Sequence, residues 1–242
     1  MKTSNQNWKN IYLWGGIAAF LSLGLSLFDI SLTMIPGWEP STVPDNLPGW
    51  FSQFQSNAWL GIRNLDFLNM IIAAIGILLL LALFGAFQQT NFSYATLALT
   101  LGLIGATLII ANNAALPMFG LSRKYAAATD TERIVLEAAG ESLLSRGEHG
   151  SKGIFIASLL SSLGTLLMSV AMLDGKVFKS STGWVGIIGM IFLIAYTIGT
   201  TFIQNIGEEI IALIAMPGGL LIIYWDVVVG RRLLSLYSEK NK

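Results

Sequence analysis

The chain has 242 residues, of which 54% are hydrophobic and 12% are charged, whereas soluble domains carry roughly 25% charged residues. Its 14 basic and 14 acidic residues balance to a formal net charge of +0, which excludes the basic footprint of a nucleic-acid-binding protein. Cysteine is absent and His149 is the single histidine, so disulfides, thiol catalysis and a multi-histidine metal site within one chain are excluded. The apolar excess fits several membrane spans rather than one soluble core.

Six apolar runs approach the length of about 20 residues that an α-helix needs to cross a bilayer core. They lie at residues 11–35, 65–87, 94–118, 153–173, 185–203 and 208–229. The first run is too long for the hydrophobic region of a signal peptide, and no small-residue cleavage site follows it. We therefore interpret it as a retained span. The sequence predicts an all-α, polytopic membrane helical bundle that forms one integral membrane domain over residues 1–242.

Two of the loops between these spans predict further structure. The first, residues 34–64, repeats Pro-Gly-Trp at Trp38 and Trp50. Proline and glycine set turns and tryptophan suits the headgroup layer, so we expect an ordered cap on the membrane surface. The third loop, residues 119–150, places Thr129 three residues before Glu132, which is the spacing of a helix capping box. An apolar stripe follows, so this loop predicts an amphipathic helix at the interface.

Small residues recur every four positions in the fourth span, at Ala157, Ser161, Thr165 and Ser169. This spacing gives one continuous face that is typical of close helix packing in membranes. We predict that a membrane protein partner or a second copy of the chain packs against it.

The sixth span contains the triplet Pro217-Gly218-Gly219. Pro217 has no N–H to donate to the carbonyl of Leu213, so the triplet predicts a kink. A kink of this kind serves either helix packing or gating.

Six spans place both termini on the same side of the membrane. Lysine and arginine are more frequent in the terminal segments and in the loop around Lys176 than in the other loops, and Arg231-Arg232 directly flanks the last span. The positive-inside rule then predicts cytoplasmic termini in the cell inner (plasma) membrane. All seven tryptophans fall in loops or at predicted span ends, which fits an aromatic belt.

Under this topology most semi-buried polar residues lie in the outer third of the bundle. They are Asp29, Arg63, Asp66, Asn69, Asn112, Asn113, Gln204, Asn205 and Glu208. Arg63, Asp66 and Asn69 are spaced by three residues and would share one helical face. One interpretation is an outward-facing polar cavity in which Asp29 and Asp66 pair with Arg63. The other is that polar residues are simply tolerated near span ends. Asp226 is the main exception, and we expect it to snorkel towards Arg231 or the inner surface.

No catalytic signature such as G-x-S-x-G, H-E-x-x-H or a Walker A loop is present. We predict no catalytic, cofactor-binding or metal-binding residues. Glu208 and Glu209 fit acids favoured in the first turn of a helix, and His149 fits an exposed loop residue. A membrane-embedded enzyme using Glu208 or His149 is the last of three functional hypotheses.

Two stretches carry a resemblance. The run from Asn112 to Met118, continued at Tyr125-Ala126-Ala127-Ala128-Thr129, is one. The other joins Ala171-Met172-Leu173, Val177-Phe178 and Trp184-Val185-Gly186-Ile187. Both resemble a group of uncharacterised bacterial integral membrane proteins that share a domain of unknown function. The likeness runs from about residue 66 onward. It implies a bacterial six-helix membrane protein and transfers no activity, cofactor or site residue.

The leading functional hypothesis is a multi-pass membrane protein that binds a small solute or lipid headgroup in an outward-facing polar cavity, as a sensor or minor transporter. The alternative is a non-catalytic structural or regulatory membrane subunit. Its partner would pack against the small-residue face of the fourth span.

Overall fold

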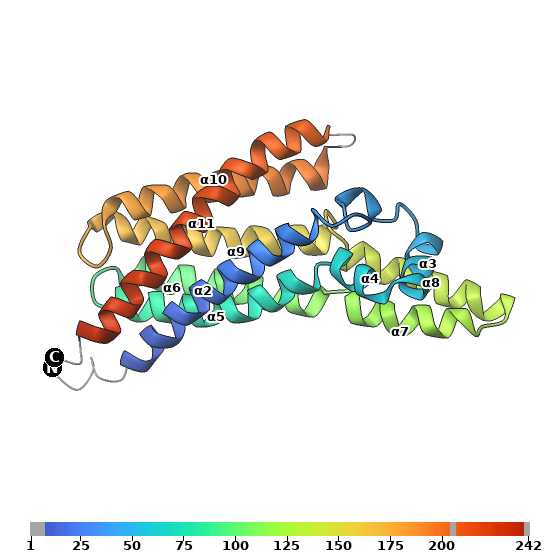
Figure 1. The fold of residues 1–242 in the computed structure, drawn as a ribbon. Helices are drawn as coiled ribbons and strands as arrows, with labels where there is room; N and C mark the ends of the chain where they lie inside the picture. The colour runs from blue at the N-terminus through green and yellow to red at the C-terminus, as the bar shows by residue number, and fades with distance from the viewer. Residues whose placement is uncertain (1–7, 204–206, 240–242) are drawn as a thin grey trace.

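The computed structural model describes residues 8–203 and 207–239. All regular secondary structure in these ranges is helical (Figure 1), which confirms the predicted all-α class. Six long helices form the main body: α2 (Lys9–Leu32), α5 (Phe67–Phe87), α6 (Phe92–Asn112), α9 (Lys152–Ala171), α10 (Ser180–Phe202) and α11 (Glu208–Glu239). By length and composition, six helical stretches of the described chain can cross a membrane, which is the signature of a membrane protein.

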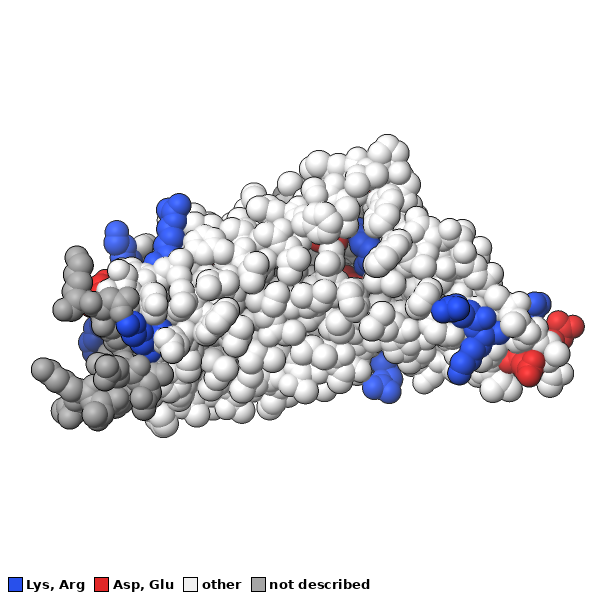
Figure 2. Space-filling model, turned by 60° about the horizontal axis from the view of Figure 1, so that its bottom comes forward, with Lys and Arg blue, Asp and Glu red and all other residues white. Residues whose placement is uncertain are grey.

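Charged side chains gather at the two ends of the molecule. Figure 2 shows mainly lysine and arginine side chains at one end, basic and acidic side chains at the other, and a mostly uncharged surface between them. The beginning of α2 and the end of α11 lie at the same end of the body (Figure 1). This placement is the one expected for an even number of spans.

The six long helices form a closed ring. Each packs against the next in chain order, and α11 packs back against α2. Long helices that follow one another in the sequence therefore lie side by side around the whole ring. Helices α5 and α9 lie across the ring and touch only slightly, so the ring has an interior. Near the end of α10 and the beginning of α11, these two helices diverge from α2 and α5 (Figure 1).

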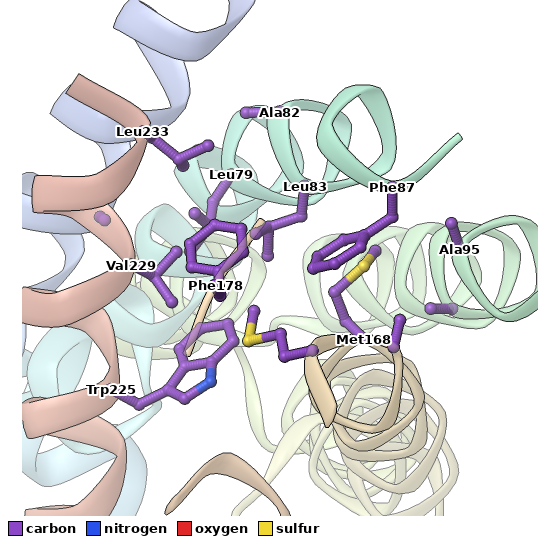
Figure 3. Close-up of a cluster of buried hydrophobic side chains, with 14 of the residues drawn as sticks. Leu79, Ala82, Leu83, Phe87, Ala95, Met168, Phe178, Trp225, Val229 and Leu233 are labelled. Atoms are coloured by element: carbon purple, nitrogen blue, oxygen red, sulfur yellow. The ribbon is translucent and has the colours of Figure 1, made fainter. Parts of the chain in front are cut away.

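At the end of the body where α2 begins, the interior is filled by apolar side chains. Phe87 of α5 stacks on Phe178, with ring centroids 5.5 Å apart, and Met168, Val229 and Leu233 close the cluster (Figure 3). These side chains are almost completely buried. They hold the ring together at this end.

A set of shorter elements caps the opposite end: η1 (Pro40–Thr42), α3 (Leu47–Ser56), α4 (Ala58–Asn64), α7 (Ala115–Ala126) and α8 (Asp130–Gly147). Helices α3, α7 and α8 share a second buried cluster around Trp50, Phe51 and Met118, and Ile62 of α4 packs against it. The rings of Phe51 and Tyr125 lie 4.4 Å apart. The first loop is thus ordered, as predicted. Helix α8 begins with the predicted capping box, in which the backbone N–H of Thr129 donates to the Glu132 carboxylate over 2.8 Å.

Two predicted spans end differently in the structure. Helix α6 stops at Asn112 because Asn113 leaves the helical conformation (φ −57°, ψ 120°). The run 94–118 is therefore divided between α6 and α7. The second span begins with Asp66 in the left-handed conformation (φ 57°), which breaks the chain into α4 and α5. Arg63 and Asn69 consequently do not share the single helical face that their spacing predicted.

Helix α11 runs ten residues beyond the predicted end at 229, to Glu239. It continues through Pro217 without a break in helical structure, so the predicted kink stays a prediction. Of the tryptophans predicted to form an aromatic belt, Trp14 and Trp184 are exposed, whereas Trp50 and Trp225 are buried and cannot face a headgroup layer. Both of these are buried because they pack inside the cap and the ring interior, respectively.

Candidate functional site

A cavity of about 370 Å³ lies inside the ring, within the size range of ligand pockets. All six long helices contribute to its wall, including Ser22 of α2, Gly76 of α5, Ile109 of α6, Ser161 of α9, Met190 of α10 and Asp226 of α11. On α5 the lining runs from Asn69 to Leu83, which corresponds to about 21 Å of helix. The cavity is therefore elongated along the helix axes.

One end of the cavity is closed by a triad of polar side chains. His149 Nδ1 lies 3.3 Å from Asp66 Oδ2, and the Tyr196 hydroxyl lies 2.8 Å from His149 Nε2. With neutral histidine, Nδ1–H donates to the carboxylate and Nε2 accepts the phenol proton. The hydrogen bond with Asp66 raises the pKa of His149 above its ordinary value. The side chain of His149 remains 49% exposed because it faces open cavity space rather than packed protein.

Backbone conformation brings these three side chains together. Asp66 has the left-handed conformation immediately before α5, and Gly150 has φ 78° directly after His149. A side chain at Gly150 would be strained at this φ, and its Cβ would lie 3.1 Å from the carbonyl oxygen of Thr200 on α10. Gly150 therefore lets the loop before α9 turn close against α10, where Tyr196 lies.

A second cavity, of about 450 Å³, lies on the other side of the triad. We call it the vestibule. Asp66, His149 and Tyr196 line both cavities, so they form the partition between them. Figure 2 shows acidic and basic atoms inside a hollow between the two charged ends. Glu148 also lines the vestibule; the Trp50 indole donates to its carboxylate over 3.3 Å, and burial raises the pKa of Glu148.

Arg63 lies in the vestibule wall, and its Nε and Nη1 donate hydrogen bonds. It donates to Asp29 Oδ1 over 3.3 Å, to the Trp38 carbonyl over 3.2 Å and to Asn64 Oδ1 over 3.1 Å. The expected contact between Asp29 and Arg63 is therefore present. Asp66 was expected to join this pair, but its ion pair is with His149 instead, because the break at Asp66 turns its side chain towards the loop before α9.

The asparagines separate into two groups. Asn113 lines the cavity and donates to the carbonyls of Leu65 and Asp66 over 3.0 and 3.2 Å, which fixes the break before α5. Asn69 also lines it and donates to Asp66 Oδ1 over 2.9 Å. Asn112, by contrast, bonds to Gly153 and Arg146 and supports the third loop. Gln204 and Asn205 lie outside the described residues, and Glu208 is described only as the first residue of α11.

The opposite end of the cavity contains Ser22, Trp225 and Asp226. Asp226 makes no hydrogen bond or ion pair with any described residue, so the expected approach to Arg231 does not occur. Instead its helix position turns it into the cavity wall. Ser22 Oγ and Trp225 Nε1 are buried and likewise have no hydrogen-bond partner within residues 8–203 and 207–239.

The middle of the wall is mainly apolar, with Ile72, Leu80, Ile154 and Ile222 among its residues. The cavity thus has its charged side chains at its two ends and, between them, a mainly apolar wall that also carries the hydroxyls of Ser158, Ser161 and Thr165. Within the described part of the chain, no three histidine, aspartate or glutamate side chains are grouped as a metal site.

A family model for a domain of unknown function, DUF4386, matches residues 11–230. The chain belongs to the DUF4386 family. No curated protein and no solved structure matches the chain. Membership confirms the resemblance found in the sequence, and it assigns no activity to the cavity.

In this DUF4386 protein the small-residue face of the fourth span packs within the chain. Ala157 and Ser169 are completely buried, while Ser161 and Thr165 line the cavity. A Cβ added at Gly105 of α6 would lie 2.4 Å from the backbone nitrogen of Ser161, so α6 and α9 are in direct backbone contact. A partner or homo-oligomer would need a different surface.

Sequence reasoning did not assign His149, Tyr196 and Asp226 to the cavity. His149 is one residue from a glycine in a polar loop, which favours exposure, and Tyr196 is a single aromatic within an apolar run. Asp226 carried the only available signal, because an acid inside an apolar run marks a functional position by default.

Proposed function

We propose that this DUF4386 protein is a multi-pass protein of the bacterial inner membrane that binds a small solute or a lipid headgroup in its central cavity. It would act as a sensor or a minor transporter. The observation that carries this proposal is the closed ring of six helices around a cavity to which every helix contributes. A bundle that served only as a structural subunit would gain stability by filling this space.

The solute would reach the cavity through the vestibule. Two hydrogen bonds hold the partition between the two spaces, and neither is buried in packed protein. Movement of one side chain, such as rotation of the Tyr196 phenol away from His149, would join them. Under the predicted topology the vestibule faces outward, and the solute would arrive from outside the cell.

The absence of native cysteine allows a direct test. Single cysteines are placed at Ser158 and Thr197, both in the cavity wall, and intact cells are treated with a small membrane-impermeant thiol reagent. We expect both positions to react. A cysteine at Leu97, which faces outward from α6, should not react, and one at Lys179 should react only after the cells are opened.

Failure of Ser158 and Thr197 to react from either side would contradict a solute-accessible cavity. Reaction of both only in opened cells would reverse the orientation and leave the cavity intact. Thermal unfolding of purified protein with candidate solutes then identifies a ligand, because a compound that binds only the folded state raises its stability.

A further inference from the structure

We propose that the central cavity selects organic cations, small ammonium compounds with an apolar body, and that Asp226 is the residue that binds the positive charge. This inference rests on the proposed function and names its class of solute. It starts from the charge on the cavity wall. The residues that line the cavity include two aspartates and no lysine or arginine.

The two aspartates differ in their surroundings. Asp66 already has a partner, because His149 lies 3.3 Å from its carboxylate. Asp226 has none among the described residues, although it lies in the cavity wall on α11. A carboxylate that leaves water without a partner is costly. A bound cation would supply the positive charge that Asp226 lacks as a partner.

Neighbouring groups independently indicate an occupant at this end. Trp225 is 2% exposed and Ser22 is 6% exposed, yet Trp225 Nε1 and Ser22 Oγ have no hydrogen-bond partner in the described chain. Both residues line the cavity. Buried polar atoms are normally paired. Ser22 Oγ can accept from an ammonium N–H, whereas the indole N–H of Trp225 only donates and would pair with an acceptor such as a water molecule that enters with the solute.

The arginine nearest to this route does not offset the acidic charge. Arg63 lies in the vestibule wall, where its charge is paired with Asp29 and its Nε and Nη1 donate to Asp29, the Trp38 carbonyl and Asn64. Glu148 adds a further carboxyl to the same wall. A cation that enters through the vestibule therefore meets acidic groups at each stage. The apolar middle of the cavity would hold the body of the molecule, because apolar surface is removed from water there.

The test compares two thiol reagents of similar size and opposite charge. A cysteine replaces Thr165, which lines the cavity, and its reaction rates with a trimethylammonium methanethiosulfonate and with a sulfonate methanethiosulfonate are measured. Each rate is divided by the rate at a cysteine replacing Lys179, outside the cavity. We expect the normalised cation rate to exceed the anion rate by about tenfold or more, since one desolvated charge contact contributes at least that factor.

The same ratio is then measured with Asp226→Asn, which removes the charge with little change in shape. We expect the preference to fall by about tenfold. Asp174→Asn, in a loop where Asn91 and Lys176 contact the carboxylate, is the matched control and should leave the ratio unchanged. Asp226→Glu retains the charge and should retain the preference, which separates loss of charge from loss of folding.

Equal normalised rates for the two reagents would overturn the proposal, as would a preference that Asp226→Asn does not alter. No reaction with either reagent at Thr165 would instead contradict the accessible cavity, and with it the proposed function. A second measurement uses benzyltrimethylammonium and phenylmethanesulfonate as free probes. The cation should raise the thermal stability of the protein and the anion should not, and Asp226→Asn should abolish the difference.

Discussion

His149 Nδ1 lies 3.3 Å from Asp66 Oδ2. This contact connects the loop before α9 with the residue that directly precedes α5, 83 positions earlier in the sequence. The Tyr196 hydroxyl completes the contact from α10. Three segments that are far apart in the chain thus meet at the partition between the vestibule and the central cavity. This contact has a definite pH dependence.

The first prediction concerns the stability that this contact contributes. Because Asp66 raises the pKa of His149 above 6.5, the folded state favours the protonated ring. The contribution is fully present below about pH 6.5 and is lost as the pH rises through the folded-state pKa. His149→Gln should therefore lower the melting temperature more at about pH 5.5 than at about pH 8.5.

Asp66→Asn is the matched control for this measurement, since asparagine tolerates the left-handed conformation that Asp66 adopts. In that background His149→Gln should have nearly the same effect at both pH values. A larger effect of His149→Gln at the higher pH in the wild-type background would contradict the assigned direction.

The second prediction concerns Arg63, whose side chain is 12% exposed. Arg63→Gln removes the charge that balances Asp29 and leaves the Trp38 carbonyl without its donor. We expect a loss of about 2 to 3 kcal/mol in the free energy of unfolding. Asp29→Asn should cost less, about 1 kcal/mol, because Arg63 keeps two other acceptors. The double variant should be less destabilised than the sum, and strict additivity would show that the two residues do not interact.

The third prediction tests the backbone contact between α6 and α9. A Cβ at Gly164 would lie 2.7 Å from the backbone nitrogen of Gly102 and 2.8 Å from the carbonyl oxygen of Ala98. Gly164→Ala must therefore separate the helices, at a cost of about 1 to 3 kcal/mol in the free energy of unfolding. Gly24→Ala in α2 meets no atom within 4 Å and should be neutral or stabilising. Equal effects of the two variants would argue against the tight contact.

The fourth prediction concerns the cap. Ser122 of α7 is buried, and its hydroxyl donates to the Phe51 carbonyl of α3 over 3.0 Å. Ser122→Ala should lower stability by about 1 kcal/mol, the typical worth of one hydrogen bond. Ser142→Ala on the exposed surface of α8 should change it by less than about 0.5 kcal/mol. The comparison uses denaturant unfolding in detergent, with protease cleavage between α7 and α8 as a second measure.

The difference between predicted and observed spans has a local cause. Asn113 and Asp66 each interrupt a helix that the apolar pattern extends through them. Asn113 Oδ1 accepts from the backbone N–H of Ala115, and its amide donates to two carbonyls beside Asp66. The Asn113 amide thus pairs backbone carbonyls that the break at Asp66 leaves free. Because the two breaks depend on each other, neither can be predicted from the apolarity of its own segment.

The sequence by itself determined the helical class, the six apolar stretches and the capping box at Thr129, because each depends on residues that are close together in the chain. It also carried the resemblance to a family of uncharacterised membrane proteins. Only the tertiary structure decided the order of the ring, the pairing of Asp66 with His149 and the position of Asp226 in the cavity wall. Sides of a membrane helix that face lipid and sides that face protein are equally apolar. Hydropathy therefore reports that a helix can cross the bilayer, whereas its neighbours depend on small residues and polar contacts brought together from distant parts of the chain.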